Sequence, residues 1–269
     1  MDIKVISVNV GKALLVSALF MFLSLVVSLS GGMDEAFSSL LISFLITLTV
    51  GAFPFIFVRK TSSISMSDGF LIITISWLLS FVFGMLPYLL YGGEFTLVNA
   101  FFESVSGYTT TGFSILKDVE ALPKSLLFWR SSTHFIGGLG VIVFLLLILP
   151  ESSPFRLRIT NLELSSLSRE GYRYRSSRTV RIMCTVYIGL VVVETLLLWA
   201  AGMSFFDAIN HSFSTIATGG FSTRNASIAY YDSRVIEAII FLFMLFAGMH
   251  FGLIFTFVTT GSFKVFKHP

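Results

Sequence analysis

Cysteine and charged residues are scarce in this sequence. One cysteine, Cys184, occurs among 269 residues, so neither a disulfide framework nor a cysteine metal site can be built within the chain. Charged residues make up 12% of the chain, whereas a soluble domain has about a quarter. Hydrophobic residues make up 55%, and the mean hydropathy is +0.87. This composition excludes a soluble globular protein and predicts a membrane protein.

Common catalytic motifs are also missing. The sequence has no Gly-x-Ser-x-Gly elbow, no Gly-Lys-Ser/Thr phosphate loop and no His-Glu-x-x-His. His134, His211 and His250 lie on different segments without the spacing of metal ligands, so a zinc or haem site is not expected. We therefore expect neither an enzyme nor an organic cofactor.

Six apolar segments are long enough to cross a bilayer, which takes about 20 residues. They are 11–30, 37–58, 69–91, 127–150, 179–201 and 235–258. The first could be a signal peptide, but it lacks a convincing cleavage site and further apolar segments follow directly, so an uncleaved span is expected. The sequence thus predicts an all-α, multi-pass membrane protein.

Basic residues gather in alternate connecting segments, at 4–12, 59–60, 156–181 and 264–267. By the positive-inside rule these segments are cytoplasmic, so both termini are expected in the cytoplasm of a cell whose inner membrane holds the chain. The Arg-rich loop 156–178 could be read as a nucleic-acid surface, but it has two tyrosines for stacking and is flanked by spans. Membrane lipid headgroups or a partner protein are expected there, and no nucleic acid.

A short polar motif occurs twice. A shift of 108 residues superposes Gly112-Phe113-Ser114 on Gly220-Phe221-Ser222, and it also aligns Ser106 with Ser214. The matches fall on small and hydroxylic residues rather than on the apolar ones that membrane composition makes common. They indicate an internal repeat in which the backbone of both copies has the same role.

Each motif follows a segment that is too short to cross a bilayer. Segments 99–108 and 207–216 suit re-entrant half-helices of about ten residues, with Asn99 and Asp207 as N-caps. The C-terminal end of such a helix carries the negative end of the helix dipole. That end favours a cation.

The two loops, 109–114 and 217–222, contain no Asp or Glu, which a divalent cation site would be expected to use. Backbone carbonyl oxygens and a Thr hydroxyl can instead replace the hydration shell of a monovalent cation. The candidate ligands are Thr110, Thr111, Gly112, Thr218, Gly219 and Gly220.

Three charged residues near the loops receive structural interpretations. Glu103 is expected to tie the first half-helix to its neighbours by hydrogen bonds rather than to bind an ion. Arg130 and Arg234 lie at outer helix ends, where their side chains can snorkel to the headgroups.

Two stretches carry a family resemblance. Residues 101–114, FFESVSGYTTTGFS, are followed by HFIGGLG at 134–140, and residues 205–222 run from FFDA to ATGGFS. They resemble the first and second pore repeats of the Trk/Ktr/HKT superfamily of potassium uptake proteins, and the extra N-terminal hairpin resembles that of the Trk membrane subunit. The resemblance implies that each repeat corresponds to one potassium-channel subunit, with a helix, a pore helix, a filter loop and a helix.

The resemblance also implies a domain organisation. An N-terminal two-helix hairpin is expected over 1–60, a first pore repeat over 61–155, and a second over 156–269. The family's filter glycine corresponds to Gly112 and Gly220, although the Gly219-Gly220 pair leaves the second position open by one residue.

Family members arrange four repeats around one pore, and two are present here. Either a second copy of the chain is expected to supply the other two, or this chain is the N-terminal half of a split or truncated protein whose other half is a separate chain. The half-protein is favoured, because the two loops differ as the family's first and second repeats differ. The resemblance further implies a cytoplasmic nucleotide-binding regulatory subunit, which the Arg-rich loop could contact.

The expected function is potassium ion transport through a filter of backbone carbonyls. A sodium or mixed monovalent cation transporter is the first alternative; relatives with Ser at the first filter position admit sodium, so Gly112 favours potassium. A non-conducting accessory or truncated half is the second alternative.

Overall fold

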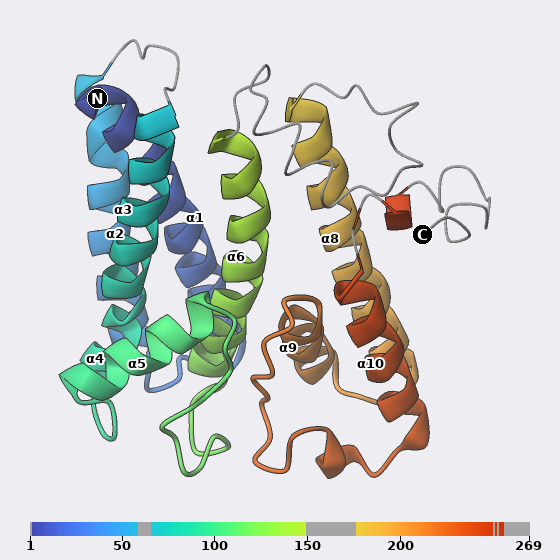
Figure 1. The fold of residues 1–269 in the computed structure, drawn as a ribbon. Helices are drawn as coiled ribbons and strands as arrows, with labels where there is room; N and C mark the ends of the chain where they lie inside the picture. Colours follow the sequence, from blue (N-terminus) through green and yellow to red (C-terminus); the bar gives the residue numbers. More distant parts are fainter. Residues whose placement is uncertain (1, 59–65, 149–175, 250, 252, 256–269) are drawn as a thin grey trace.

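All regular elements in the described part of the chain are helices (Figure 1). The computed structural model describes residues 2–58, 66–148, 176–249, 251 and 253–255, with the backbone alone for 66, 141–148 and 176–180. The all-α fold class is confirmed.

An N-terminal hairpin precedes the repeats. Helix α1 (Ile3–Ser30) is capped by Asp2, whose carboxylate accepts hydrogen bonds from the backbone N–H groups of Lys4 and Val5. Helix α2 (Phe37–Phe57) returns along α1 (Figure 1). The two helices are in close contact at Gly11 and Gly51, as small residues allow in membrane helices.

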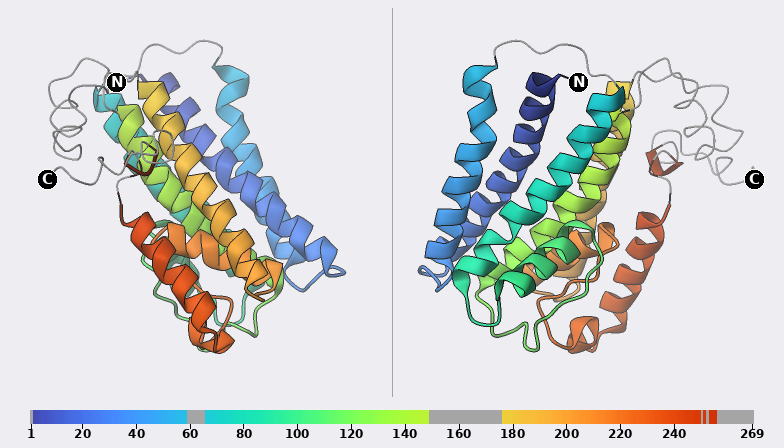
Figure 2. Two further views of the ribbon diagram at one scale, coloured as in Figure 1. Left: turned by 90° about the vertical axis from the view of Figure 1, so that its right-hand side faces the viewer. Right: turned by 60° about the vertical axis from the view of Figure 1, so that its left-hand side comes forward.

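The first repeat consists of α3 (Met66–Gly84), α4 (Leu86–Tyr91), the short helix α5 (Leu97–Tyr108) and the long helix α6 (Lys124–Ile148). The second consists of α8 (Ser176–Ala200), the short helix α9 (Phe205–Ile216), the 3-10 helix η2 (Ser227–Tyr231) and α10 (Arg234–Ala247). Both short helices lie toward the end of the bundle opposite the N-terminus (Figures 1 and 2). The order expected for each repeat is therefore present.

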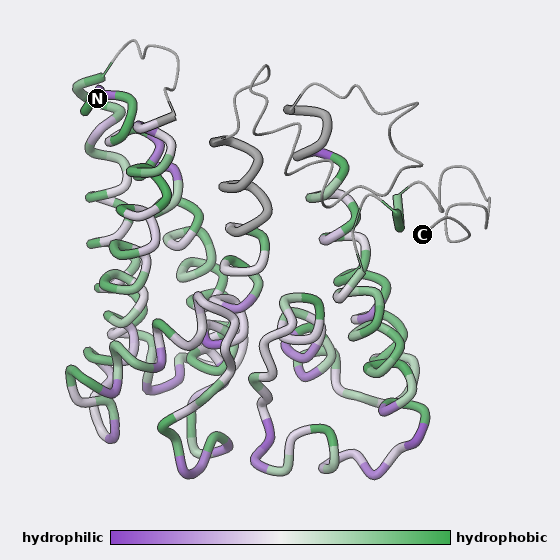
Figure 3. The backbone as a smooth tube through the Cα atoms, in the orientation of Figure 1, coloured by the Kyte–Doolittle hydropathy of each residue, from purple (hydrophilic) through white to green (hydrophobic). Residues whose placement is uncertain are grey.

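Four described segments are long and apolar enough to cross a membrane: Ile3–Ser30, Phe37–Phe57, Ser67–Tyr91 and Arg181–Ala200. They coincide with four of the six expected spans. The other two, 127–150 and 235–258, fall on α6 and α10 and lie partly outside the described residues. Apolar residues run along the helices, while hydrophilic residues concentrate in the loops at the end that carries the short helices (Figure 3).

The expected N-caps of the short helices are wrong by three residues. Thr96 caps α5 and Ser204 caps α9, because their hydroxyl oxygens accept from the backbone N–H groups of Asn99 and Asp207. Asn99 and Asp207 are thus the third helical residues. Each short helix has 12 residues instead of about ten.

The hairpin is joined to the first repeat by polar contacts that are buried or partly buried. The Tyr108 hydroxyl lies 2.8 Å from the Ser17 hydroxyl of α1. At the loop end, the Asp34 carboxylate accepts from the hydroxyls of Ser28 at 2.7 Å and Ser125 at 2.8 Å. These bonds fix the end of α5 and the start of α6 against the hairpin.

The Gly11 contact generates a stability prediction. A Cβ atom at Gly11 would lie 2.6 Å from the carbonyl oxygen of Gly51, so Gly11→Ala must separate α1 from α2. We expect a lower apparent unfolding temperature in detergent, corresponding to about 1–3 kcal/mol of overpacking.

Gly189→Ala in α8 is the control, because a Cβ there meets nothing within 4 Å. Equal unfolding temperatures for the two variants would contradict the close approach of α1 and α2.

Candidate functional site

The two polar loops share one unusual backbone shape. Thr110 has φ 54° and Thr218 has φ 56°, and Gly112 and Gly220 follow at φ 78° and 108°. Positive φ is uncommon for residues other than glycine, so its recurrence at positions 108 residues apart is a specific match. It also identifies Gly220, rather than Gly219, as the counterpart of Gly112.

The backbone N–H groups of both loops bond back to the preceding short helix. In the first loop, the N–H of Thr111 donates to the carbonyl of Ser106 at 2.9 Å. In the second, the N–H of Gly219 donates to the carbonyl of Ser214 at 2.8 Å. The N–H groups of Thr110 and Thr218 are bonded in the same repeated pattern. Each loop is therefore fixed to the C-terminal end of its helix.

The carbonyl oxygens of these loops have no such partners. Within the described residues, no hydrogen-bond donor reaches the carbonyls of 110–112 or 218–220. The backbone thus presents acceptors only, close to the negative end of the helix dipole. Chemically, this arrangement suits a cation that has lost part of its water shell.

The two loops touch each other. A Cβ atom added at Gly112 would collide with the carbonyl oxygen of Gly219, so the first loop passes directly beside the second. A Cβ at Gly219 would in turn collide with the imidazole of His134 on α6. The structure therefore brings all six sequence-predicted ligand residues into two adjoining segments, and glycine is required where they meet.

Side chains behind the second loop are packed and hydrogen-bonded. The His134 ring stacks on Phe221 at 4.0 Å, and its Nδ1 lies 3.0 Å from the Ser214 hydroxyl. The Ser214 oxygen also accepts the N–H of Gly220 at 2.9 Å. In the first loop, the equivalent Ser106 hydroxyl donates to the carbonyl of Phe113 at 2.5 Å. His134 is thus a supporting residue, as is His211, which lies between the Asp207 carbonyl and the Ser222 hydroxyl.

A buried ion pair connects the two loops. The Glu103 carboxylate accepts from Arg130 Nε at 2.6 Å, with side-chain exposures of 0% and 4%. Glu103 also accepts from the hydroxyl of Ser114 at 2.9 Å. Arg130 Nη1 donates to the carbonyl of Ser222 at 3.1 Å, and the guanidinium lies 3.6 Å from the centre of the Phe221 ring. The Glu103–Arg130 pair therefore contacts the end of both loops: Ser114 in the first, and Phe221 and Ser222 in the second.

The hydrogen-bonding role expected for Glu103 is confirmed, and the snorkelling expected for Arg130 is wrong. Arg130 is buried because Glu103 compensates its charge and the Ser222 carbonyl takes a second N–H. A sequence signal existed, since an acidic residue on one short helix and an Arg on the next apolar helix are natural partners. Arg234, in contrast, is exposed at the start of α10, as expected.

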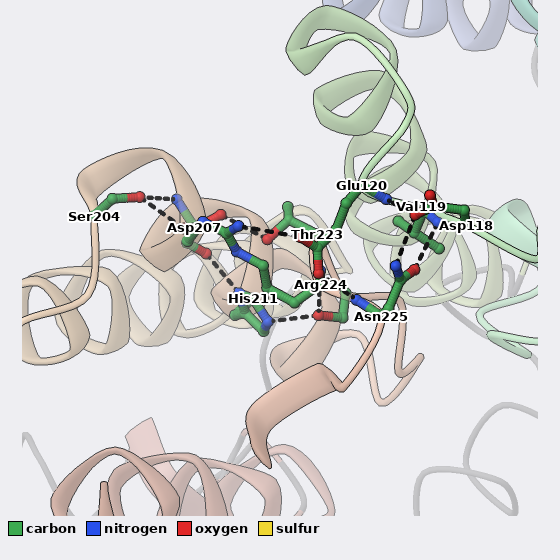
Figure 4. Close-up of polar contacts among 10 residues, drawn as sticks. Asp118, Val119, Glu120, Ser204, Asp207, His211, Thr223, Arg224 and Asn225 are labelled. Atoms are coloured by element: carbon green, nitrogen blue, oxygen red, sulfur yellow. Dashed lines mark hydrogen bonds and ion pairs between the residues drawn. The ribbon is translucent and has the colours of Figure 1, made fainter. Parts of the chain in front are cut away.

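Asp207 lies in the first turn of the second short helix, α9 (Figure 4). Burial would raise the pKa of its carboxyl, but hydrogen bonds from Thr223 and Ser204, together with the charge of Arg224, hold that pKa below its usual value. The Thr223 hydroxyl donates at 2.6 Å and Arg224 Nη2 at 3.2 Å. Asp207 therefore stabilises the chain that leaves the second loop.

No cluster of three or more His, Cys, Asp or Glu side chains that could hold a metal ion occurs in the part of the chain that the structure describes. His250 lies outside the described residues.

Comparisons with known proteins agree with this geometry. Residues 37–268 match the TrkH family, described as cation transport proteins. The Trk system potassium uptake protein TrkH of Salmonella typhimurium is 42% identical over 172 residues, which cover 64% of this chain and 36% of that protein. The Escherichia coli protein TrkG of the same system is 35% identical over 170 residues, 63% of this chain and 35% of that protein.

A solved structure is similar as well. The crystal structure of the potassium transporter TrkH from Vibrio parahaemolyticus superposes with a TM-score of 0.78 at 33% identity. The match covers 97% of this chain and 53% of that one, so the chain spans about half the length of the solved transporter.

The buried ion pair predicts a large effect on stability. Arg130→Gln leaves the Glu103 carboxylate buried without its cation, which typically costs about 3–5 kcal/mol. We expect a marked fall in the apparent unfolding temperature of the protein in detergent.

Arg234→Gln removes an Arg of the same charge from an exposed helix start and serves as the control. The double variant Glu103→Gln with Arg130→Gln should lose less than the sum of its two single variants. Additive losses, or equal effects of Arg130→Gln and Arg234→Gln, would refute the ion pair's role.

Proposed function

Because this chain belongs to the TrkH family of cation transport proteins, we propose that it forms part of a potassium-conducting pore in a cell membrane. The observation that carries the proposal is the pair of adjoining loops whose N–H groups are bonded and whose carbonyl oxygens are not. Two relatives named for potassium uptake, and a related potassium transporter of known structure, support the choice of ion.

Backbone carbonyls form the filter of the proposed pore. The ligands are contributed by Thr110, Thr111 and Gly112 in one segment and by Thr218, Gly219 and Gly220 in the other. Their carbonyl oxygens replace the water around the transported K⁺. Neither segment contains a carboxylate, so the ion is bound weakly enough to leave. The transported ion is the only small molecule required; the chain acts as a transporter and not as an enzyme.

The proposed organisation places a two-helix hairpin at 1–60, a first pore repeat at 61–155 and a second at 156–269. Two of these boundaries, and the Arg-rich loop 156–178, lie outside or at the margin of the described residues. Two further filter segments of the same kind complete the pore. A cytoplasmic nucleotide-binding subunit regulates the pore through the Arg-rich loop.

The proposed orientation has both termini in the cytoplasm of a cell with an inner membrane. Lys4 and Lys12 are on the first half of α1, at the end of the bundle opposite the filter segments (Figure 1), which supports a cytoplasmic N-terminus. The filter segments then open toward the outer side.

Sodium or mixed monovalent cation transport is the second candidate. The observation that would favour it is the absence of carboxylates in either filter segment, since neutral oxygens alone accept any monovalent cation. Gly112 nevertheless favours potassium, so sodium should compete poorly with rubidium for uptake.

The filter assignment is tested with Gly112→Ser. The new side chain would be strained at φ 78° and would collide with the Gly219 carbonyl. We expect rubidium uptake to fall about tenfold or more, because strain of this kind costs about 1–3 kcal/mol. The variant is introduced at the chain's native locus, in cells that lack other potassium uptake systems, so that any completing chain is present.

Gly93→Ser is the matched control, because Gly93 also has positive φ (64°) but has no atom within 4 Å of its Cβ position. Unchanged uptake in Gly112→Ser would show that the filter lies elsewhere. Strong inhibition of wild-type uptake by sodium would favour the mixed transporter, and wild-type membranes without uptake would favour a non-conducting half.

A further inference from the structure

The outer loops that follow the two filter segments are bonded directly to each other (Figure 4). Asn225 of the second repeat accepts the N–H of Val119 on its side-chain oxygen at 2.7 Å. Its side-chain Nδ2 donates to the Asp118 carboxylate at 2.7 Å, and its backbone N–H donates to Glu120 at 3.0 Å. All three partners are consecutive residues of the first repeat.

The residue beside Asn225 strengthens the same connection. Arg224 lies between two carboxylates, with Nη2 3.2 Å from Asp207 of its own repeat and Nη1 3.5 Å from Glu120 of the other. Its guanidinium also lies 4.2 Å from the centre of the Tyr230 ring. We call Arg224 and Asn225, with residues 118–120, the outer clamp.

The outer clamp is continuous with the filter. The N–H of Arg224 donates to the Ser222 hydroxyl at 3.0 Å, and Ser222 lies two residues after the filter candidate Gly220. The Ser222 carbonyl accepts from Arg130 at 3.1 Å. The second filter segment is therefore held against the first repeat both from inside, by Arg130, and from outside, by the clamp.

The distance between the two filter segments depends on the contacts made by Arg130 and by the outer clamp. The segments meet at Gly112 and Gly219, and among the described residues no backbone hydrogen bond joins one segment to the other. Selection between ions by carbonyl oxygens has been ascribed to the size of the site and to the number and field strength of the oxygens, and both depend on where the two segments are held. A loosened clamp would let the two segments shift and adapt to a smaller ion.

We propose that Asn225 is a positioning residue that fixes the spacing of the two filter segments and thereby sets the preference for potassium over sodium. The inference rests on the proposed function as a potassium pore. Asparagine is suited to this position because one amide group supplies both a donor and an acceptor. The hydrogen bond from Asn225 also lowers the pKa of the exposed Asp118 carboxyl, which keeps it charged as the acceptor.

The test breaks the Asn225–Asp118 bond with one variant, weakens it with a second, and then rebuilds it. Asn225→Asp removes the donor and sets two carboxylates against each other, whereas Asp118→Asn leaves an uncharged amide oxygen that still accepts from Asn225 Nδ2. The double variant Asp118→Asn with Asn225→Asp restores one amide donor and one carboxylate acceptor in exchanged positions. Lys117→Gln is the control, because it lies in the same exposed loop and makes the net charge more negative by one, as Asn225→Asp does.

The measured quantity is the ratio of rubidium to sodium uptake, with each variant introduced at the native locus. A ratio does not depend on how much protein reaches the membrane. We expect Asn225→Asp to lower it about fivefold, as for the loss of one hydrogen bond, and Asp118→Asn to lower it less, because its bond is weakened and not lost; rubidium uptake itself is retained in both. The double variant should recover most of the ratio, and Lys117→Gln should match the wild type.

Two results would overturn the inference while leaving the proposed function intact. One is a wild-type ratio in Asn225→Asp, and the other is a double variant whose ratio is no better than that of Asn225→Asp. Wild-type membranes that take up no rubidium would instead refute the proposed function, and this inference with it.

Discussion

The ion pair between Glu103 and Arg130 links three parts of the molecule that the chain keeps far apart. Glu103 belongs to the first short helix, Arg130 to the following long helix, and the Ser222 carbonyl that Arg130 binds follows the second loop. A buried pair is stable only when its remaining hydrogen-bonding groups are satisfied, and here Ser114 and Ser222 satisfy them. The ion pair therefore fixes the position of the second repeat relative to the first.

A second constraint follows from the membrane. Backbone without helical bonding is tolerated at membrane depth only where it is buried in protein or lines a water-filled path. The two loops meet this condition for their N–H groups, which bond to the short helices, and leave their carbonyls for another partner. In the proposed function, that partner is a dehydrated cation. The bonded N–H groups then fix the loops, and the carbonyl oxygens bind the cation.

Much of this arrangement could be predicted from the sequence, because the repeat preserves the residues that make the unusual turns. Thr110 and Gly112 reappear at Thr218 and Gly220 with the same backbone conformations, and the order of long and short helices follows from the length of the apolar segments. The N-caps were misplaced because Asn and Asp are good caps in general, whereas Thr96 and Ser204 occupy the capping positions here. The opposite charges of Glu103 and Arg130 were a signal for their pairing, but the cross-repeat contacts of Asn225 depend on which loops meet in three dimensions, which local sequence does not encode.

The central claim is that the carbonyl oxygens of 110–112 and 218–220 bind a dehydrated monovalent cation. It is tested most directly by diffraction from the complex purified from its native membrane in rubidium, with data collected at the rubidium absorption edge. The account predicts an anomalous peak within coordination distance of carbonyl oxygens from both segments. A rubidium peak elsewhere in the molecule, with none beside these carbonyls, would contradict it.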